Sequence, residues 1–203
     1  MTEDGSRYNF DGLVVFDLAN NHQGDIDHGC RIIRAMGEQA AKHGVKAAMK
    51  FQFRQLDTFI HKAHLDGSSN KHVSRFLSTR LDLDGVQKLF DEVKAAGLLS
   101  MCTPFDEESV DVIQDMGFDI LKIASCSAAD WPLLEKATGT GLPIVCSTGG
   151  LDLSQVDDLD SFFNHRGVDF ALMHCVSVYP TPANMLELNQ IDLFRDRYPG
   201  PPI

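Results

Sequence analysis

The feature that most constrains the fold is a repeated unit: a short run rich in β-branched residues, then a polar turn, then a segment with helical periodicity. Strands that alternate with helices are typical of a parallel sheet, because parallel strands need a long crossover that is usually a helix. The pattern predicts six strands, at residues 13–18, 47–51, 98–102, 120–123, 144–146 and 170–175. We therefore predict an α/β fold.

Helix signals lie between these strands. Asp130 and Pro132 mark the start of one helix, and Gly117 marks the end of another. Apolar residues recur every three or four positions over 86–93 and 156–163, which indicates helix faces that pack on a sheet. The segment 53–83 is longer than a usual βα loop of about 2–6 residues, so we expect it to rim the active face. Its histidines are interpreted as solvated surface residues: His61, His64 and His72.

Two architectures fit this alternation, an open doubly wound sheet and an eight-stranded barrel. A dinucleotide-binding sheet would carry Gly-x-Gly-x-x-Gly after its first strand, but the turn at 17–24 contains one glycine, Gly24. The barrel is favoured. We predict a single domain over residues 1–203, a (β/α)8 TIM barrel truncated after about six β/α units. Residues 186–195 are predicted to be helical, and residues 198–203 to lead into a seventh strand.

Composition excludes several functions. A net charge of −11 over 203 residues argues against nucleic acid, which selects clustered Lys and Arg. No apolar run reaches the roughly 20 residues that span a membrane, and the first ten residues lack a signal-peptide pattern. We expect a cytoplasmic protein. Its five cysteines, without a Cys-x-x-Cys pair, are expected to be reduced.

The candidate site follows from the barrel, because residues at the carboxyl ends of its strands converge on one face. Two lysines, several hydroxyls and a Ser-Thr-Gly-Gly turn suit a ligand with a phosphate and a carboxylate. The turn precedes a helix, where backbone N–H groups can face an anion. The strand-end residues are Asp17, Asn20, Asn21, His22, Lys50, Gln52, Thr103, Lys122, Ser125, Ser147, Thr148, Gly149, Ser177 and Tyr179.

Each residue also has a structural interpretation. Lys50 alone is equally consistent with a structural ion pair, and Asp106 with a helix cap. His22 is balanced between loop scaffold and site, whereas His174 is expected to be packed or hydrogen-bonded. Four cysteines near strand ends could form a thiolate cluster, but we favour small buried residues: Cys102, Cys126, Cys146 and Cys175.

Six motifs in order resemble the sialic acid synthase (N-acetylneuraminate synthase) family, which includes spore coat polysaccharide biosynthesis protein E and the pseudaminic and legionaminic acid synthases. The resemblance covers essentially the whole chain after residue 10. The motifs are Asn-Asn-His-Gln-Gly at 20–24, Met-Lys-Phe-Gln at 49–52, Cys-Thr-Pro-Phe-Asp at 102–106, Leu-Lys-Ile-Ala-Ser at 121–125, Ser-Thr-Gly at 147–149 and His-Cys-Val-Ser-Val-Tyr-Pro-Thr-Pro at 174–182.

The resemblance implies that phosphoenolpyruvate condenses with N-acetylmannosamine or a related N-acetyl hexose to give a nine-carbon 2-keto sugar acid and phosphate, in surface or spore-coat polysaccharide biosynthesis. A divalent metal, Mn2+ or Mg2+, would polarise the sugar aldehyde. The implied catalytic residues are Asp17, Lys50, Lys122 and Tyr179. The implied phosphoenolpyruvate-binding residues are Lys50, Thr103, Lys122, Ser125, Ser147, Thr148, Gly149, Ser177 and Tyr179. The implied sugar-binding residues are Asp17, Asn21 and Tyr179.

Three positions depart from the family pattern. Asp17 stands where Glu is usual, Ser127 where many members carry an acid, and Ser177 where Asn is usual. Ser127 cannot replace an acid in proton transfer near neutral pH.

The family's seventh and eighth strands, with the metal-binding histidines, and its antifreeze-like C-terminal domain would lie beyond Ile203. We therefore expect no metal ligands in this sequence, no activity from this part alone, and a homodimer when intact. Two alternatives remain open: a non-catalytic barrel that binds phosphate or sugar, and another phosphoenolpyruvate aldol-type synthase that acts on a sugar phosphate.

Overall fold

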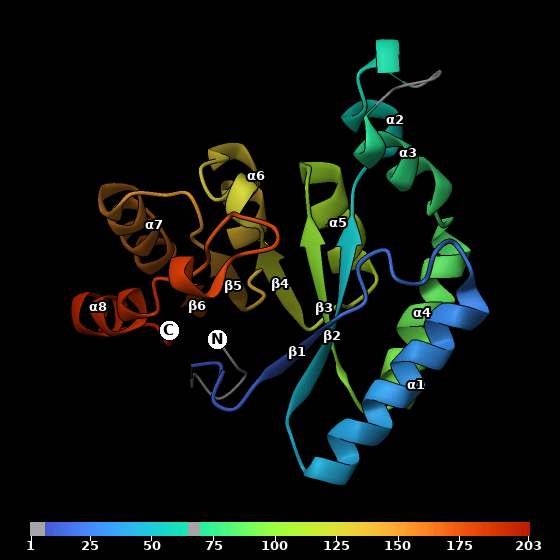
Figure 1. Cartoon of the computed structure of the whole chain (residues 1–203), viewed down its shortest axis with the longest axis horizontal. Helices are drawn as coiled ribbons and strands as arrows, with labels where there is room; N and C mark the ends of the chain where they lie inside the picture. Colours follow the sequence, from blue (N-terminus) through green and yellow to red (C-terminus); the bar gives the residue numbers. More distant parts are fainter. Residues whose placement is uncertain (1–6, 65–69) are drawn as a thin grey trace. The chain divides into compact units, whose positions relative to one another are not determined.

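The computed structural model describes residues 7–64 and 70–203, which form two compact units (Figure 1). The first unit is Gly12–Asp119, and the second joins Met1–Asp11 to Ile120–Ile203. Each contains three parallel strands with helices between them. The six strands predicted from the sequence are therefore confirmed. Part of the segment predicted to rim the active face, residues 65–69, lies outside the described residues.

The first unit alternates strands and helices, with extra helical segments between its second and third strands. Its strands are β1 (Val14–Asp17), β2 (Ala47–Phe53) and β3 (Leu99–Pro104). Its helical segments are α1 (Ile26–His43), α2 (Leu56–Phe59), η1 (Lys62–His64), α3 (Lys71–Ser78), α4 (Leu83–Ala95) and α5 (Glu107–Asp115). In the parallel register, Asp17 lies opposite Lys50, and Gln52 opposite Thr103.

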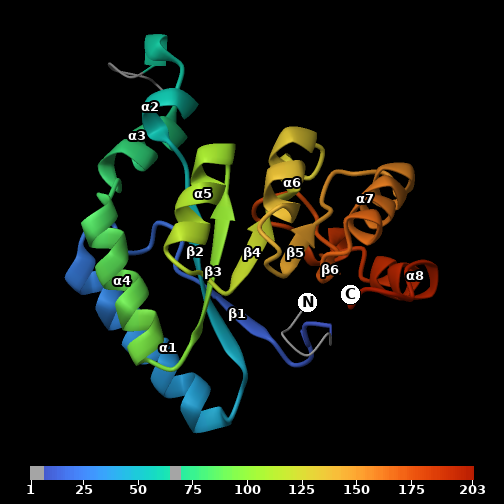
Figure 2. The ribbon, with the colours of Figure 1, turned by 180° about the vertical axis from the view of Figure 1, so that it is seen from behind.

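The core of the first unit lies between its strands and the helices α1 and α4. Phe118 is 2% exposed, and its ring centroid lies 4.9 Å from that of Phe90 on α4 and 5.5 Å from that of Phe51 on β2. The two helices run side by side in both views (Figures 1 and 2). A Cβ on Gly37 would lie 2.8 Å from the Cβ of Ala96, so this close approach requires glycine.

The second unit repeats the same alternation. Its strands are β4 (Ile120–Ile123), β5 (Ile144–Ser147) and β6 (Phe170–Met173). Its helical segments are η2 (Ser125–Ser127), α6 (Trp131–Thr138), α7 (Leu153–Arg166), η3 (Ala183–Met185) and α8 (Asn189–Arg197). Leu133 and Leu134 on α6 and Phe163 on α7 are fully buried, and the Phe163 ring packs 5.0 Å from that of Phe170.

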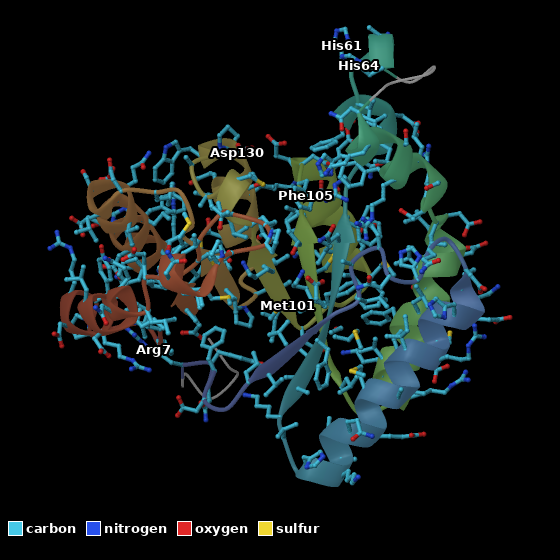
Figure 3. The ribbon with its side chains drawn as sticks, in the orientation of Figure 1. Arg7, His61, His64, Met101, Phe105 and Asp130 are labelled. Atoms are coloured by element: carbon cyan, nitrogen blue, oxygen red, sulfur yellow. The ribbon has the colours of Figure 1, made fainter. Side chains whose placement is uncertain are left out.

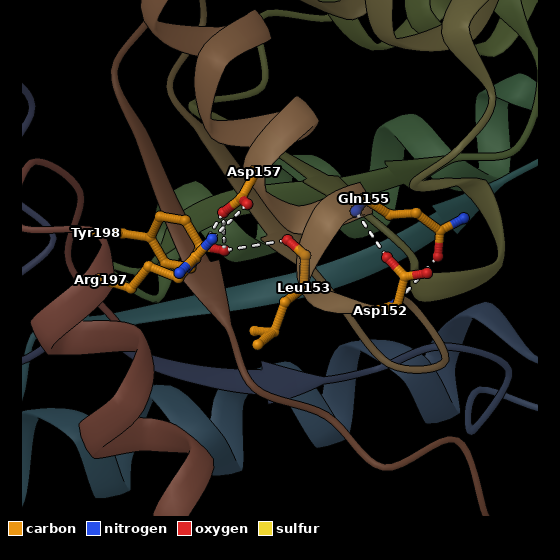
Figure 4. Close-up of polar contacts among 6 residues, drawn as sticks. All are labelled: Asp152, Leu153, Gln155, Asp157, Arg197 and Tyr198. Atoms are coloured by element: carbon orange, nitrogen blue, oxygen red, sulfur yellow. Dashed lines mark hydrogen bonds and ion pairs between the residues drawn. The ribbon is translucent and has the colours of Figure 1, made fainter.

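Local contacts fix the ends of α7 and α8. Asp152 and Gln155 form a capping box at the start of α7 (Figure 4). Farther along α7, Asp157 receives a bidentate pair of hydrogen bonds from Arg197, at 2.7 and 2.6 Å, and another from the Tyr198 hydroxyl at 2.8 Å. These contacts draw a carboxylate, a guanidinium and a phenol together, and so attach the end of α8 to α7.

The chain after α8 turns back to the strands of the second unit. The Leu172 N–H of β6 donates to the Pro202 carbonyl at 2.9 Å. This bond resembles the one from Ile144 to Asp169, at the start of the β5–β6 pairing. The predicted approach to a further strand therefore lies beside β6. Within the described residues, no helix combines the length and apolar character needed to cross a bilayer.

Candidate active site

A buried lysine marks the carboxyl end of β4. Lys122 is 8% exposed, and its Nζ donates to Ser147 Oγ on β5 at 2.5 Å and to the Ile123 carbonyl at 2.6 Å. Burying an ammonium group is costly, and these bonds offset part of that cost. The sequence predicted that Lys122 and Ser147 would meet, and the structure brings them together.

A second group of contacts, the hydroxyl cluster, consists of Ser125, Gly149 and Ser177. The Gly149 N–H donates to Ser125 Oγ at 3.1 Å. A Cβ on Gly149 would lie 2.5 Å from Ser177 Oγ, a distance that real Cβ atoms essentially never show. It would also lie 3.0 Å from Ser125 Oγ, which is closer than nearly all real Cβ contacts. Glycine is therefore what allows the two hydroxyls to approach the turn after β5.

The same turn departs from the geometry expected of an anion-binding loop. Thr148 donates both its N–H, at 3.1 Å, and its hydroxyl, at 2.9 Å, to the Met173 carbonyl. Since the Gly149 N–H is bonded to Ser125, these two N–H groups already have partners inside the protein. The ring of Tyr179 is 93% exposed, so it is not packed into the hydroxyl cluster. An anion here would be held mainly by Lys122 and side-chain hydroxyls.

The first unit contains an ion pair at the ends of β1 and β2. Lys50 Nζ lies 2.9 Å from Asp17 Oδ1, and the Lys50 side chain is 13% exposed while that of Asp17 is 53% exposed. Asn21 Nδ2 donates to the Asp17 carbonyl at 3.2 Å, and Thr103 on β3 is 2% exposed. The structural ion pair considered for Lys50 is thus present, and its half-exposed carboxylate remains accessible to a ligand.

Arg54 lies just beyond β2 and was not among the expected site residues. Its guanidinium carbon lies 4.0 Å from the ring centroid of Phe105 and 4.1 Å from that of Phe76. Phe105 follows the end of β3 (Figure 3). The Arg54 Nη2 donates to Gln52 Oε1 at 3.0 Å. The signal in the sequence was spacing, since Arg54 continues the every-second-residue pattern of Lys50 and Gln52 one residue past the end of β2.

His22 is buried, at 7% exposed, and its Nδ1 accepts a hydrogen bond from the Gly24 N–H at 3.1 Å. That bond assigns the proton of the neutral ring to Nε2. Burial is the main cause that lowers the pKa of His22, with a smaller contribution from His28. The ring is therefore a neutral hydrogen-bond donor near pH 7.

Several structural interpretations are confirmed. Asp106 caps α5 by accepting from the Ser109 N–H at 2.7 Å, and its second oxygen accepts from the Gln55 N–H at 2.8 Å. His174 Nε2 lies 2.9 Å from the Leu186 carbonyl. The three rim histidines are exposed, and Figure 3 shows His64 in the η1 segment and His61 directly before it.

The residues that the structure describes include no group of three or more His, Cys, Asp or Glu side chains placed to hold a metal ion. All five cysteines are free thiols. Burial raises the pKa of Cys102 well above its usual value, and that of Cys146 to about 12. Thiols that stay protonated are poor metal ligands, which argues against a thiolate cluster.

Parallel strands with helical crossovers, and with polar residues at the strand ends, define an α/β protein. A solved structure of spore coat polysaccharide biosynthesis protein E from Chromobacterium violaceum ATCC 12472 is 46% identical, with a TM-score of 0.91 over 94% of this chain and 56% of that one. The predicted α/β fold, with six successive β/α units of a (β/α)8 barrel, is confirmed. Residues 36–202 match the NeuB family, and the chain belongs to that family.

Other relatives carry related names. An N-acetylneuraminic acid synthetase structure from Leptospira borgpetersenii, in complex with citrate, is 26% identical with a TM-score of 0.79, over 92% of this chain and 61% of that one. The N-acetylneuraminate-9-phosphate synthase of Drosophila melanogaster is 29% identical over 193 residues, 92% of this chain and 50% of the relative. The resemblance to sialic acid synthases is confirmed. The chain spans about half the length of the curated relatives it matches.

Proposed function

We propose that this chain carries the phosphoenolpyruvate-binding part of a synthase that joins phosphoenolpyruvate to N-acetylmannosamine or a related N-acetyl hexose. The product is a nine-carbon 2-keto sugar acid, and inorganic phosphate is released. The observation that carries the proposal is the buried Lys122, bonded to Ser147 at the same strand ends as the hydroxyl cluster. The names of the relatives support a sugar-acid synthase.

The chemistry of the second unit suits an anionic substrate. A buried ammonium group interacts more strongly with an anion than an exposed one does, because little water screens the charge. Hydroxyls add directed hydrogen bonds, which orient a carboxylate or phosphate relative to the lysine. In this proposal Lys122 holds an acidic group of phosphoenolpyruvate, and Ser125, Ser147 and Ser177 orient it.

In the first unit, Asp17 is proposed to contact the acceptor sugar, and Lys50 to bind phosphoenolpyruvate and take part in catalysis. The alkene carbon of phosphoenolpyruvate forms a carbon–carbon bond to the aldehyde carbon, whose oxygen takes up a proton. Water then adds to the resulting cationic carbon and loses a proton. When that carbon's bond to the phosphate oxygen breaks, the new hydroxyl loses its remaining proton and becomes the ketone oxygen, and inorganic phosphate leaves. Lys50 supplies a positive charge and a proton donor, and Asp17 accepts hydrogen bonds from sugar hydroxyls.

Tyr179, Thr103 and Asn21 keep their proposed roles as substrate contacts. A requirement for Mn2+ or Mg2+ is also proposed, and its chemistry would be polarisation of the aldehyde. The described residues include no group of three or more His, Cys, Asp or Glu side chains that fits this metal. A cytoplasmic location and a homodimer are further proposals.

The test is an enzyme-coupled assay of phosphate release by the protein encoded by the complete reading frame, with phosphoenolpyruvate, Mn2+ and an N-acetyl hexosamine. We expect phosphate release that depends on both substrates. The proposal would be refuted if no N-acetyl hexosamine, phosphorylated or not, supported phosphate release.

A non-catalytic binding barrel is the second candidate, because Ser127, which is buried, stands where the resemblance places an acid in many family members. It predicts calorimetric binding of phosphoenolpyruvate with no turnover.

A further inference from the structure

A short series of contacts lies at the carboxyl end of β2 and involves Gln52, Arg54 and two aromatic rings. The guanidinium carbon of Arg54 lies 4.0 Å from the ring centroid of Phe105 and 4.1 Å from that of Phe76. A guanidinium group is planar and is attracted to the faces of aromatic rings. Because two rings contact it at this distance, the Arg54 side chain is held in one orientation.

The same guanidinium fixes the direction in which the Gln52 amide faces. Arg54 Nη2 donates to Gln52 Oε1 at 3.0 Å. Arginine has five N–H donors and no acceptor, so it can bond the oxygen of the amide but not its nitrogen. Since the oxygen faces Arg54, the NH2 group of Gln52 points the other way. Among the residues that the structure describes, none accepts a hydrogen bond from this nitrogen.

The Gln52 side chain lies on the same face of β2 as Lys50. It follows Lys50 by two residues, so the two side chains are roughly 7 Å apart along the strand. Phe51, between them, leaves the opposite face and packs its ring on Phe118. Gln52 also lines a cavity of about 580 Å3 in the first unit. Its NH2 group is therefore a hydrogen-bond donor next to the lysine that acts in the proposed reaction.

We infer that Arg54 is a positioning residue of the synthase: it acts through Gln52, whose fixed NH2 group donates to an oxygen of the acceptor sugar. A free amide can turn by half a rotation and present either its oxygen or its nitrogen. A partner that excludes the wrong orientation prepares the site before the sugar binds, which strengthens binding. This inference rests on the proposed function and adds a residue to it.

The experiment is a double-mutant cycle at saturating phosphoenolpyruvate, using the protein encoded by the complete reading frame and the N-acetyl hexosamine that gives the fastest phosphate release. Gln52→Leu removes the amide, and Arg54→Met removes the donor but keeps an apolar side chain against the rings. Gln52→Leu should raise KM for the sugar about tenfold, and Arg54→Met about three- to tenfold. KM for phosphoenolpyruvate should stay within twofold of wild type in both variants.

The double variant separates positioning from a structural role. If Arg54 acts through Gln52, the double variant should have the same KM for the sugar as Gln52→Leu alone, within about twofold. Arg54→Lys, which keeps a donor, should recover part of the loss. Arg75→Met is the matched control, because Arg75 is exposed on α3 and does not line the cavity, and its KM values should equal those of the wild type.

Two results of the cycle would overturn the inference and leave the proposed function intact. In the first, the effects of Arg54→Met and Gln52→Leu multiply in the double variant, as expected if Arg54 only supports the fold. In the second, Arg54→Met has the KM of the wild type for the sugar.

Failure of the proposed function gives a different result, which is no turnover of any N-acetyl hexosamine by the wild type. The contact between Arg54 and Gln52 is then decided by 15N NMR of the same protein. The Arg54 guanidinium N–H signals should be resolved in the wild type and averaged in Gln52→Leu. Signals that are already averaged in the wild type, or that Gln52→Leu leaves unchanged, would overturn the inference.

Discussion

Replacing Lys122 with methionine removes the buried charge on which the proposed phosphoenolpyruvate site depends. The side chain keeps a similar length and apolar stem, so the space beside Ser147 stays filled. Lys122 bonds to Ser147 and to the Ile123 carbonyl in the protein alone, and a bound anion would receive the same ammonium group. A hydrogen bond to a charged partner contributes about 1.5–3 kcal/mol. The dissociation constant for phosphoenolpyruvate should therefore rise about 10- to 150-fold.

Isothermal titration calorimetry of the wild-type and Lys122→Met proteins measures this change directly. Lys136→Met is the matched control, because Lys136 is an exposed lysine on α6 of the same unit. It should bind phosphoenolpyruvate as the wild type does. Replacing a buried charge with an apolar side chain is often neutral for stability, so we expect both variants to fold. A folded Lys122→Met protein that binds within twofold of wild type would refute the reasoning.

Three further predictions test the fold and the site. Gly149→Ala should weaken phosphoenolpyruvate binding in calorimetry, because its Cβ would collide with the hydroxyl cluster, whereas Gly200→Ala, with nothing within 4 Å, should not. Gly37→Ala should lower the free energy of unfolding in urea by about 1–3 kcal/mol through overpacking, and Ala96→Gly in the same chain should recover most of it. Hydrogen bonds from Arg197 and Tyr198 lower the pKa of Asp157 to about 2, so they stabilise the fold above about pH 4. The melting temperature of the wild type should fall as the pH is lowered from 4 to 2, and that of the Asp157→Asn variant should fall by less. An equal fall in the two proteins would contradict this assignment.

The sequence predicted the strands well, because runs of β-branched residues alternate regularly with segments whose apolar residues have helical spacing. Boundaries shifted by one or two residues: β3 begins at Leu99 and extends to Pro104, beyond the predicted end at residue 102. The last helix begins at Asn189, three residues after the predicted start. Such ends depend on capping and tertiary contacts that a periodic pattern does not record.

The candidate site was predictable where strand order alone decides position, as for Lys122 beside Ser147 and Lys50 beside Asp17. It was not predictable where a long segment folds back. Arg54 packs against Phe76 of α3, and no local pattern specifies where that helix lies. The partners of the Thr148 N–H and hydroxyl were also unpredictable, because both depend on the Met173 carbonyl of a later strand.

The most direct measurement of the central claim follows the carbon atoms of the substrate. The protein encoded by the complete reading frame would be incubated with phosphoenolpyruvate carrying 13C at its alkene CH2 carbon, an N-acetyl hexosamine in its neutral and 6-phosphate forms, and Mn2+. The synthase account predicts, by mass spectrometry and NMR, a 2-keto sugar acid three carbons longer than the acceptor, with the label bonded to the former aldehyde carbon. Labelled phosphoenolpyruvate that stays intact, or is converted only to pyruvate, would contradict it.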